Sequence, residues 1–337
     1  MAEERIDLAT EVKKQHTVPR FLLSNFGKGK NARKRQLFTF DKEIERVFLQ
    51  SVMGASVRRN FYNIENHPDQ VSLEPILCII EGAAAPIIKR IVKKRHIGWL
   101  TNEEREIVAI FAVMQKARSF QALCTVEDLI ASISKMVTSR GYRPEDVDAL
   151  LAKNNSPGLK NFFLQTLLDH IDHAQILLRK NWILYETTGR DPFYISDNPV
   201  TLHNDEDFGP FWGNLGLGVR GIQIHLPLSS TLTLAFTCPS IAERAIRAKE
   251  QLEKLARVDK TIYFKFDSPS AVLQHGEAYL TGTPMRTTSA NVRFLNSLQV
   301  RFAERFVFCE SDDFGLVREM LSHSEKYKTG IRPRFSQ

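Results

Sequence analysis

The sequence contains no apolar run that approaches the roughly 20 residues a membrane-spanning helix requires. Its opening residues, 1–7, contain no apolar signal core. We therefore expect a cytoplasmic protein that makes no membrane contact.

Cysteine is scarce, and its spacing does not indicate metal binding. No C-x-x-C pair occurs, and the four cysteines stand singly, at Cys78, Cys124, Cys238 and Cys309. A zinc ribbon or a disulfide framework needs paired or regularly spaced cysteines. Each thiol is therefore interpreted as a small core side chain rather than a nucleophile.

The common sequence signatures of nucleotide and ester chemistry are also missing. There is no G-x-x-x-x-G-K-[ST] phosphate loop and no G-x-S-x-G elbow, which disfavours P-loop NTPases and α/β-hydrolases. Residues 216–221 fit G-x-G-x-x-G, but the dinucleotide fingerprint needs a strand before it and a helix after it. Here a Gly- and Trp-containing loop comes first and the strand-like residues 222–226 follow. His170 and His173 lack the H-E-x-x-H pattern, which argues against a metal site there.

What is present is the composition of a globular protein, with 43% hydrophobic and 25% charged residues in a chain of 337. Apolar residues recur at helical spacing through the middle of the chain. From Trp182 onward the pattern changes to short aromatic and aliphatic strands, and residues 36–40 and 46–49 are expected to form a hairpin.

These segments predict an α+β fold in which a helical middle, residues 71–180, packs against a small mixed sheet. The sheet would combine the N-terminal hairpin with strands from residues 181–310. We expect a single domain over residues 13–323, preceded by a polar lead-in (1–12) and followed by a basic tail (324–337).

Positive charge is concentrated near the N-terminus. The net charge is +7, and residues 13–35 contain eight Lys/Arg residues and no acid. Basic clusters attract phosphate-bearing partners, so RNA or DNA is the expected partner. The substrate-binding candidates in this loop are Lys28, Lys30, Arg33, Lys34 and Arg35. The alternative is a solvated loop without a ligand.

The first candidate site surrounds His16, which precedes a short predicted helix that Thr17 can cap. A histidine at a helix start can act as acid or base near neutral pH. A nearby arginine and free helix N–H groups suit phosphate or carboxylate. We therefore take His16 and Arg20 as catalytic candidates and Gln15 as a substrate-binding candidate. The alternative is that His16 bonds the backbone and Arg20 bridges to an acid.

The second candidate site is the segment 196–199, Ser-Asp-Asn-Pro, at the end of a predicted apolar strand. Proline pushes Asn198 out of helical geometry, and Asp and Asn side chains close such turns. Polar side chains at strand ends often carry function. Asp197 is a catalytic candidate and Asn198 a substrate-binding candidate. The alternative is an Asx turn that only ends the strand.

The third candidate set lies on two long predicted helices. Gln115 and Arg118 are one turn apart and share a face. If both helices face one cleft, Glu81 is a catalytic base or metal ligand, Arg118 is an anion clamp and Gln115 contacts substrate. The alternative is a structural Glu–Arg pair.

With these residues identified, the chain resembles a microbial family known only as a domain of unknown function. The resemblance rests on Q-H-x-x-P-R-F-L at residues 15–22 and F-x-x-S-D-N-P at 193–199, with weaker matches at 38–42 and 227–229. It spans roughly residues 14 to 310. The resemblance implies a common site for His16, Arg20, Asp197 and Asn198. It implies no established reaction.

These features predict a nucleic-acid-processing enzyme, a hydrolase that acts as a nuclease on RNA or DNA in stress or antiviral phage defence. His16 would be the acid or base, and Arg20 and Arg118 would stabilise phosphate charge. Asp197 and Glu81 would orient His16 or hold Mg²⁺ or Mn²⁺. Two alternatives stay open: a non-catalytic module that binds nucleic acid or protein, and an enzyme acting on a small anionic substrate or nucleotide.

Overall fold

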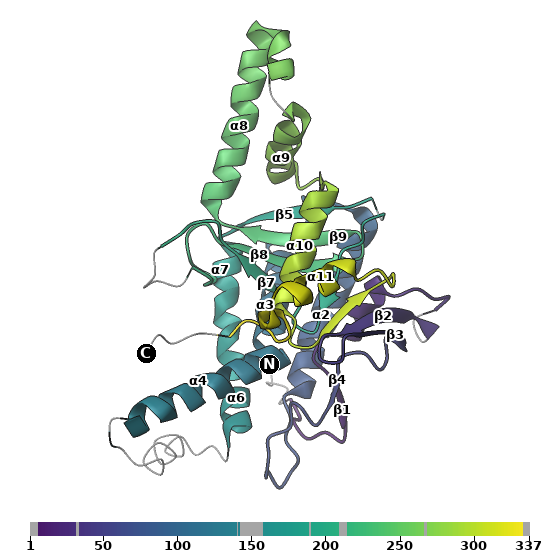
Figure 1. The fold of residues 1–337 in the computed structure, drawn as a ribbon, viewed down its shortest axis with the longest axis vertical. Coiled ribbons are helices and arrows are strands. Elements are labelled where there is room, and N and C mark those ends of the chain that lie inside the picture. The colour runs from purple at the N-terminus through teal and green to yellow at the C-terminus, as the bar shows by residue number, and fades with distance from the viewer. Residues whose placement is uncertain are drawn as a thin grey trace, which may run out of the picture.

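The structure is a computed structural model that describes residues 6–31, 34–139, 141, 158–188, 190–208, 214–265 and 268–332. It has the predicted α+β architecture, with the helices of the middle of the chain beside the sheets (Figure 1). The strands expected to form one small sheet are divided between a five-stranded and a four-stranded sheet.

The five-stranded sheet has the order β10-β5-β9-β8-β7. Its strands are β5 (Asn181–Glu186), β7 (Thr201–His203), β8 (Gln223–Ser229), β9 (Leu232–Thr237) and β10 (Met285–Arg286). Neighbouring strands are antiparallel except β10 and β5, which are parallel. Every residue of β9 is buried, which is the pattern of a strand covered on both faces.

The four-stranded sheet joins distant parts of the chain in the order β3-β2-β11-β6. Its strands are β2 (Gln36–Asp41), β3 (Arg46–Ser51), β6 (Ile195–Ser196) and β11 (Phe306–Cys309). The predicted hairpin is confirmed, because β2 and β3 pair antiparallel with Asp41 opposite Arg46. All pairings in this sheet are antiparallel, so the first hairpin is completed by the last strand.

A two-stranded sheet that the sequence pattern did not predict holds the first motif. β1 (Lys14–His16) pairs antiparallel with β4 (Val57–Arg59), with His16 opposite Val57. The chain then enters the short helix α1 (Arg20–Leu23) and the turn η1 (Ser24–Phe26).

The predicted helices of the middle of the chain are largely confirmed. They are α2 (Glu74–Lys94), α3 (Asn102–Ala117), α4 (Phe120–Ser139), α6 (Leu159–Leu167), η3 (Leu168–His173) and α7 (Ala174–Leu178). α3 begins at a capping box, in which the side chains of Thr101 and Glu104 each accept the other's backbone N–H. Residues 142–157 of the predicted helical middle lie outside the described residues.

The remaining helices follow the strands. They are α8 (Pro239–Val258), η4 (Lys260–Lys265), α9 (Pro269–Thr281), α10 (Ser289–Phe302), α11 (Gly315–His323) and η5 (Glu325–Tyr327). α8 and α9 lie side by side and form an arm that projects from the sheets (Figure 1).

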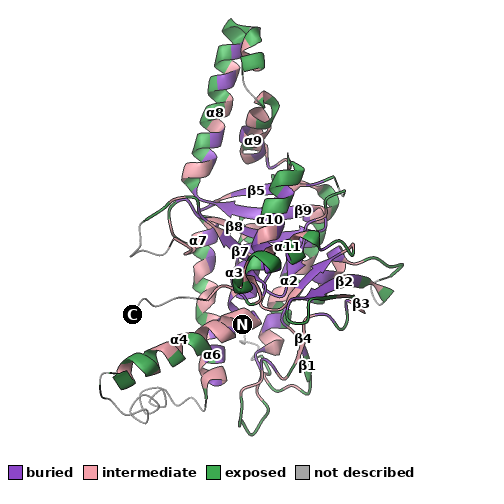
Figure 2. Ribbon diagram, viewed as in Figure 1, coloured by how far each residue is buried: buried purple, intermediate pink, exposed green. Residues whose placement is uncertain are grey.

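The largest apolar cluster joins α2, α3 and the five-stranded sheet, and its buried residues form the centre of Figure 2. Phe21 of α1 packs against Phe111 of α3 with ring centres 5.4 Å apart. This contact fixes the segment after His16 against α3. Of the cysteines, Cys238 and Cys309 are buried as expected, whereas Cys78 is exposed and the core interpretation is wrong for it.

Over the described ranges, no single helix has the length and apolarity needed to cross a membrane; only the bent pair α3 and α4, taken together, meets those two criteria.

Candidate functional site

Gln15 is a structural residue of the first motif. Its side chain is completely buried, and its amide donates to Asn63 Oδ1 at 2.7 Å and to Ser72 Oγ at 3.2 Å. Its Oε1 accepts the backbone N–H of Tyr62 at 2.7 Å. Because both ends of the amide are satisfied, Gln15 anchors β1 and is not available to a substrate.

His16 lies on the other side of β1 and is half-buried. Its Nδ1 is 3.1 Å from the carbonyl oxygen of Ala55. A carbonyl only accepts, so Nδ1 carries the hydrogen and Nε2 has the lone pair. Burial and the positive charges of Arg20 and Arg118 lower the pKa of His16 to about 4. The imidazole is therefore neutral at pH 7, with a basic nitrogen that has no partner among the described residues.

Glu81, Gln115 and Arg118 converge as predicted. The Arg118 guanidinium is 2% exposed and donates from Nη1 to Glu81 Oε1 at 2.6 Å. Its Nε and Nη2 donate to Gln115 Oε1 at 3.1 and 2.8 Å. Gln115 Nε2 in turn donates to the carbonyl of Thr17 at 2.9 Å. One network thus joins α2, α3 and the residue that follows His16.

Arg20 completes the positive side of this group. It is exposed, and its one contact in the described part of the chain is from Nη1 to the Met53 sulfur at 3.5 Å. Its charge acts on both His16 and Glu74. An arginine without a carboxylate partner at this position is free to meet an anion.

Glu74 belongs to the same group and was not predicted. Burial and the negative charge of Glu81 raise its pKa to about 7, opposed by Arg118 and Arg20. Its backbone N–H donates to Ser72 Oγ at 3.2 Å, the same oxygen that Gln15 contacts. This shared hydroxyl ties the start of α2 to β1.

The sequence carried one signal for this face of α2. Glu74, Cys78 and Glu81 are spaced four and three residues apart, which places them on one side of a helix. The Cys78 thiol lies 4.0 Å from Glu74 Oε1. Burial and the charges of Glu74 and Glu81 raise the pKa of Cys78, so the thiol stays protonated and is a poor nucleophile. Together, His16, Arg20, Glu74, Glu81 and Arg118 are called the His16 cluster below.

Asp197 makes no contact with His16, which corrects the expectation that it orients the imidazole. Its carboxylate accepts the backbone N–H groups of residues 304, 305 and 306 at 2.8 to 2.9 Å. Burial raises its pKa while these three hydrogen bonds act in the opposite direction. The carboxylate is fully engaged in closing the turn between α10 and β11.

The side-chain amide nitrogen of Asn198 also bonds within the fold, whereas its Oδ1 is buried without a hydrogen-bond partner among the described residues. Its Nδ2 donates to Gln121 Oε1 and to the carbonyl of Phe302, each at 3.2 Å. The hydroxyl of Ser196 donates to Gln299 Oε1 at 2.8 Å. The second motif therefore clamps the C-terminal end of α10.

The two motifs still share a small pocket of about 290 Å³, which Thr17 and Asp197 both line. Arg58 also lines it and stacks on Phe120, with the guanidinium carbon 3.2 Å from the ring centre. His16 and Arg20 do not line this pocket. The two motifs therefore meet at this pocket through Thr17 and Asp197.

The basic loop is exposed where it is described. Lys28, Lys30 and Lys34 are exposed, and Arg35 donates to the carbonyl of Ser24 at 2.6 Å. Arg33 lies outside the described residues. The backbone of Lys28 pairs with that of Gln36 in both directions, so β2 anchors the base of the loop.

Within the part of the chain that the structure describes, no three His, Cys, Asp or Glu side chains are grouped so that they could hold a metal ion. The described residues therefore provide no set of three such ligands for the expected Mg²⁺ or Mn²⁺. Glu81, the expected ligand, is occupied by Arg118.

The match to known families agrees with the resemblance drawn from the motifs. The model of the family described as "Protein of unknown function (DUF4238)" covers residues 14–313. The chain belongs to this family. No curated protein and no solved structure matches it.

Proposed function

We propose that the chain is a ribonuclease that cleaves RNA at the His16 cluster by acid–base chemistry. The observations that carry the proposal are a neutral histidine, whose Nε2 has no partner among the described residues, and a carboxyl group whose pKa is raised to about 7. Both groups feel the charges of the same two arginines. Opposed pKa shifts of this kind are typical of an acid and a base with separate roles.

His16 is the proposed base. The Ala55 carbonyl holds the hydrogen on Nδ1, and Nε2 takes the proton of a ribose 2′-hydroxyl. The 2′-oxygen then forms a bond to phosphorus.

Glu74 is the proposed acid. Its carboxyl donates its proton to the 5′-oxygen as the bond from phosphorus to that oxygen breaks. The products are a strand that ends in a cyclic phosphate and a strand that begins with a free 5′-hydroxyl. The proton taken up by His16 and the one released by Glu74 balance the step.

Arg20 is the proposed partner of the phosphate. It is exposed and has no carboxylate within ion-pair distance in the described residues, so it can meet the phosphate oxygens as negative charge develops. Arg118 is a positioning residue, because its donors are already bound to Glu81 and Gln115. The exposed lysines of the basic loop add attraction for the strand.

RNA is the proposed substrate because the reaction uses the 2′-hydroxyl as its internal nucleophile. A DNA strand of the same sequence lacks this group, so the same acid and base have no nucleophile to activate. This difference provides a test within one enzyme preparation.

The test is to incubate the purified full chain with a 5′-labelled single-stranded RNA and with its DNA counterpart. We expect cleavage of RNA alone, with cyclic phosphate ends detected by mass spectrometry. His16→Ala and Glu74→Gln should each lower the rate by about 100-fold or more, in the range for loss of a general acid or base.

His67→Ala and Glu106→Gln are matched controls, since both residues are exposed and lie outside the His16 cluster. They should cleave at the wild-type rate. If the wild-type chain leaves RNA intact, or if His16→Ala cleaves as fast as wild type, the proposal fails.

A further inference from the structure

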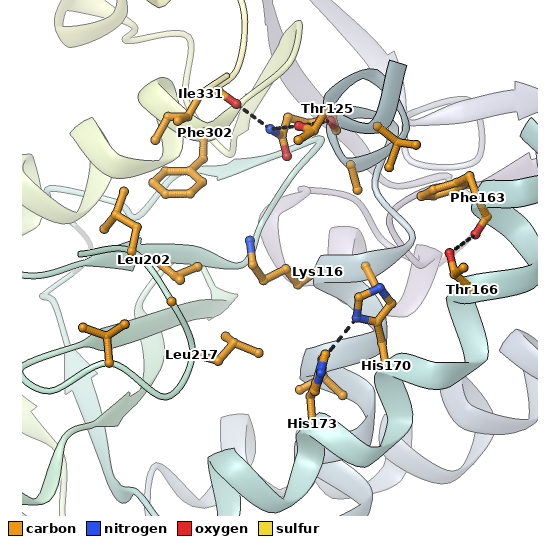
Figure 3. A pocket seen from close by; sticks show the side chains of 18 of the residues that line it. Lys116, Thr125, Phe163, Thr166, His170, His173, Leu202, Leu217, Phe302 and Ile331 are labelled. Carbon is orange, nitrogen blue, oxygen red and sulfur yellow. Dashed lines mark hydrogen bonds between the residues drawn. The ribbon is translucent and has the colours of Figure 1, made fainter. Parts of the chain in front are cut away.

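A cavity of about 820 Å³ is bounded by α3, α4, α6, η3 and residues 214–219 (Figure 3). No member of the His16 cluster lines it. Its walls are mainly apolar, and include Val113, Val126, Phe163, Leu202, Leu217 and Phe302. A concave, largely apolar space of this size with a few polar groups is typical of a small-molecule site.

Lys116 is the one fully charged side chain among the described residues that line the cavity. Figure 3 shows it extending from α3 into the open space. Its ammonium nitrogen lies 5.9 Å from the ring centre of Phe302. No carboxylate or hydrogen-bond partner for this nitrogen is found within the described ranges, and no acid lines the cavity there.

An ammonium group in apolar surroundings without a partner is unfavourable unless an anion pairs with it. Burial lowers the pKa of Lys116 to about 8, so most molecules still carry the charge at neutral pH. The cavity therefore offers one positive charge and a large apolar surface to whatever fills it.

His170 and His173 supply a polar edge on the wall formed by η3. Their Nδ1 atoms are 3.2 Å apart, so one ring donates to the other. Burial, His173 and Lys116 lower the pKa of His170, which keeps that ring uncharged.

We propose that this cavity binds an organic monoanion with an apolar body, an aliphatic or aromatic carboxylate whose head group pairs with Lys116. A single cation balances a single negative charge. A nucleotide carries more charge and would leave part of it uncompensated against apolar walls. The site is thus distinct in chemistry from the phosphate site proposed at His16.

The test is calorimetric titration of the full chain with decanoate and with decan-1-ol, which share the chain and differ in the charge. Decanoate should bind at least 10-fold more tightly than the alcohol. Its binding should show a negative heat-capacity change, the mark of apolar burial.

Lys116→Met keeps the length of the side chain and removes the charge. It should weaken decanoate binding by about 10-fold or more and leave the alcohol unchanged. Lys135→Met is the matched control, because Lys135 is exposed on α4 and does not line the cavity. Ala122→Phe fills the cavity without changing its charge and should weaken the binding of both decanoate and decan-1-ol. This second variant tests the cavity even if Lys116→Met fails to fold.

The proposal is overturned if wild type does not bind decanoate, if the alcohol binds as tightly, or if Lys135→Met has the effect of Lys116→Met. Equal binding of decanoate to wild type and to Ala122→Phe would also overturn it. None of these outcomes depends on whether the chain cleaves RNA.

Discussion

At the scale of single residues, His16 and Glu74 titrate in opposite directions from their ordinary values. His16 acts as a base only when deprotonated, which it is above a pKa of about 4. Glu74 acts as an acid only when protonated, which it is below a pKa of about 7. Both are in the required state between these two values.

The first prediction is a bell-shaped pH profile. The kcat/KM for RNA cleavage should rise through about pH 4, stay high between the two values and fall through about pH 7. The measurement is the initial rate of cleavage in overlapping buffers of constant ionic strength. A profile that rises through pH 7 would mean that the assigned roles are wrong.

The second prediction is that Glu74→Gln stabilises the protein at alkaline pH. The pKa of Glu74 is about 7 in the folded chain, against an ordinary value of 4.5 for a solvated glutamate. Between these values the folded state keeps a proton that the unfolded state releases, so the free energy of unfolding falls as pH rises. Gln cannot ionise, so the variant should gain about 1 to 3 kcal/mol at pH 8 and about nothing at pH 4.

Chemical denaturation at both pH values measures this difference. Glu106→Gln, which is exposed on α3, should show no gain at pH 8. A loss of stability in Glu74→Gln at pH 8 would show that the ionised carboxylate is well accommodated and would contradict the raised pKa.

At the scale of elements, the spacing of apolar residues predicted the long helices and the β2–β3 hairpin. These elements depend on residues that are close together in the sequence, so a local pattern is enough to predict them. The convergence of Glu81, Gln115 and Arg118 was also foreseeable, since an acid amid apolar residues needs a partner. Glu74 was missed because an acid in the first turn of a helix has an ordinary role as a complement to the helix dipole.

The contacts of the second motif could not be predicted from local sequence patterns. Asp197 at a strand end fits a functional residue, but its three partners come from residues 304 to 306, more than 100 positions later. No local pattern encodes that pairing. The β1–β4 sheet was missed for the same reason, as its strands have three residues each and are about 40 positions apart.

The third prediction separates these motifs at the element scale. Asp197→Asn replaces one oxygen by an NH₂ group that faces backbone donors, so it should cost about 2 to 4 kcal/mol of folding free energy. The rate of RNA cleavage per folded molecule should stay that of wild type. Asp312→Asn, at an exposed position, is the control for stability. If the Asp197→Asn protein is folded but no longer cleaves RNA, Asp197 belongs to the catalytic site and the prediction is wrong.

At the scale of the whole molecule, the four-stranded sheet makes the two ends of the chain depend on each other. Asp41 at the end of β2 accepts hydrogen bonds from Arg305, whose Nε lies 3.0 Å from both carboxylate oxygens and whose Nη2 donates to Oδ2 at 2.6 Å. Lys42, which is completely buried, donates to the carbonyls of Val300 and Ala303 at 3.0 and 2.6 Å. The first hairpin thereby satisfies the last carbonyls of α10.

The fourth prediction follows from this closure. Lys42→Met fills the same space but leaves the carbonyls of Val300 and Ala303 buried without donors, which should cost about 2 to 4 kcal/mol. Because the sheet joins residues 36–51 to residues 306–309, the loss should lower the stability of the entire chain and not only of the hairpin.

The unfolding transitions measured by tryptophan fluorescence and by far-UV circular dichroism should therefore shift together to a lower denaturant midpoint, as one cooperative transition. Lys89→Met, at an exposed position on α2, should leave both midpoints in place. Separate transitions for the two probes in Lys42→Met would show that the hairpin unfolds independently and that the ends of the chain are not coupled.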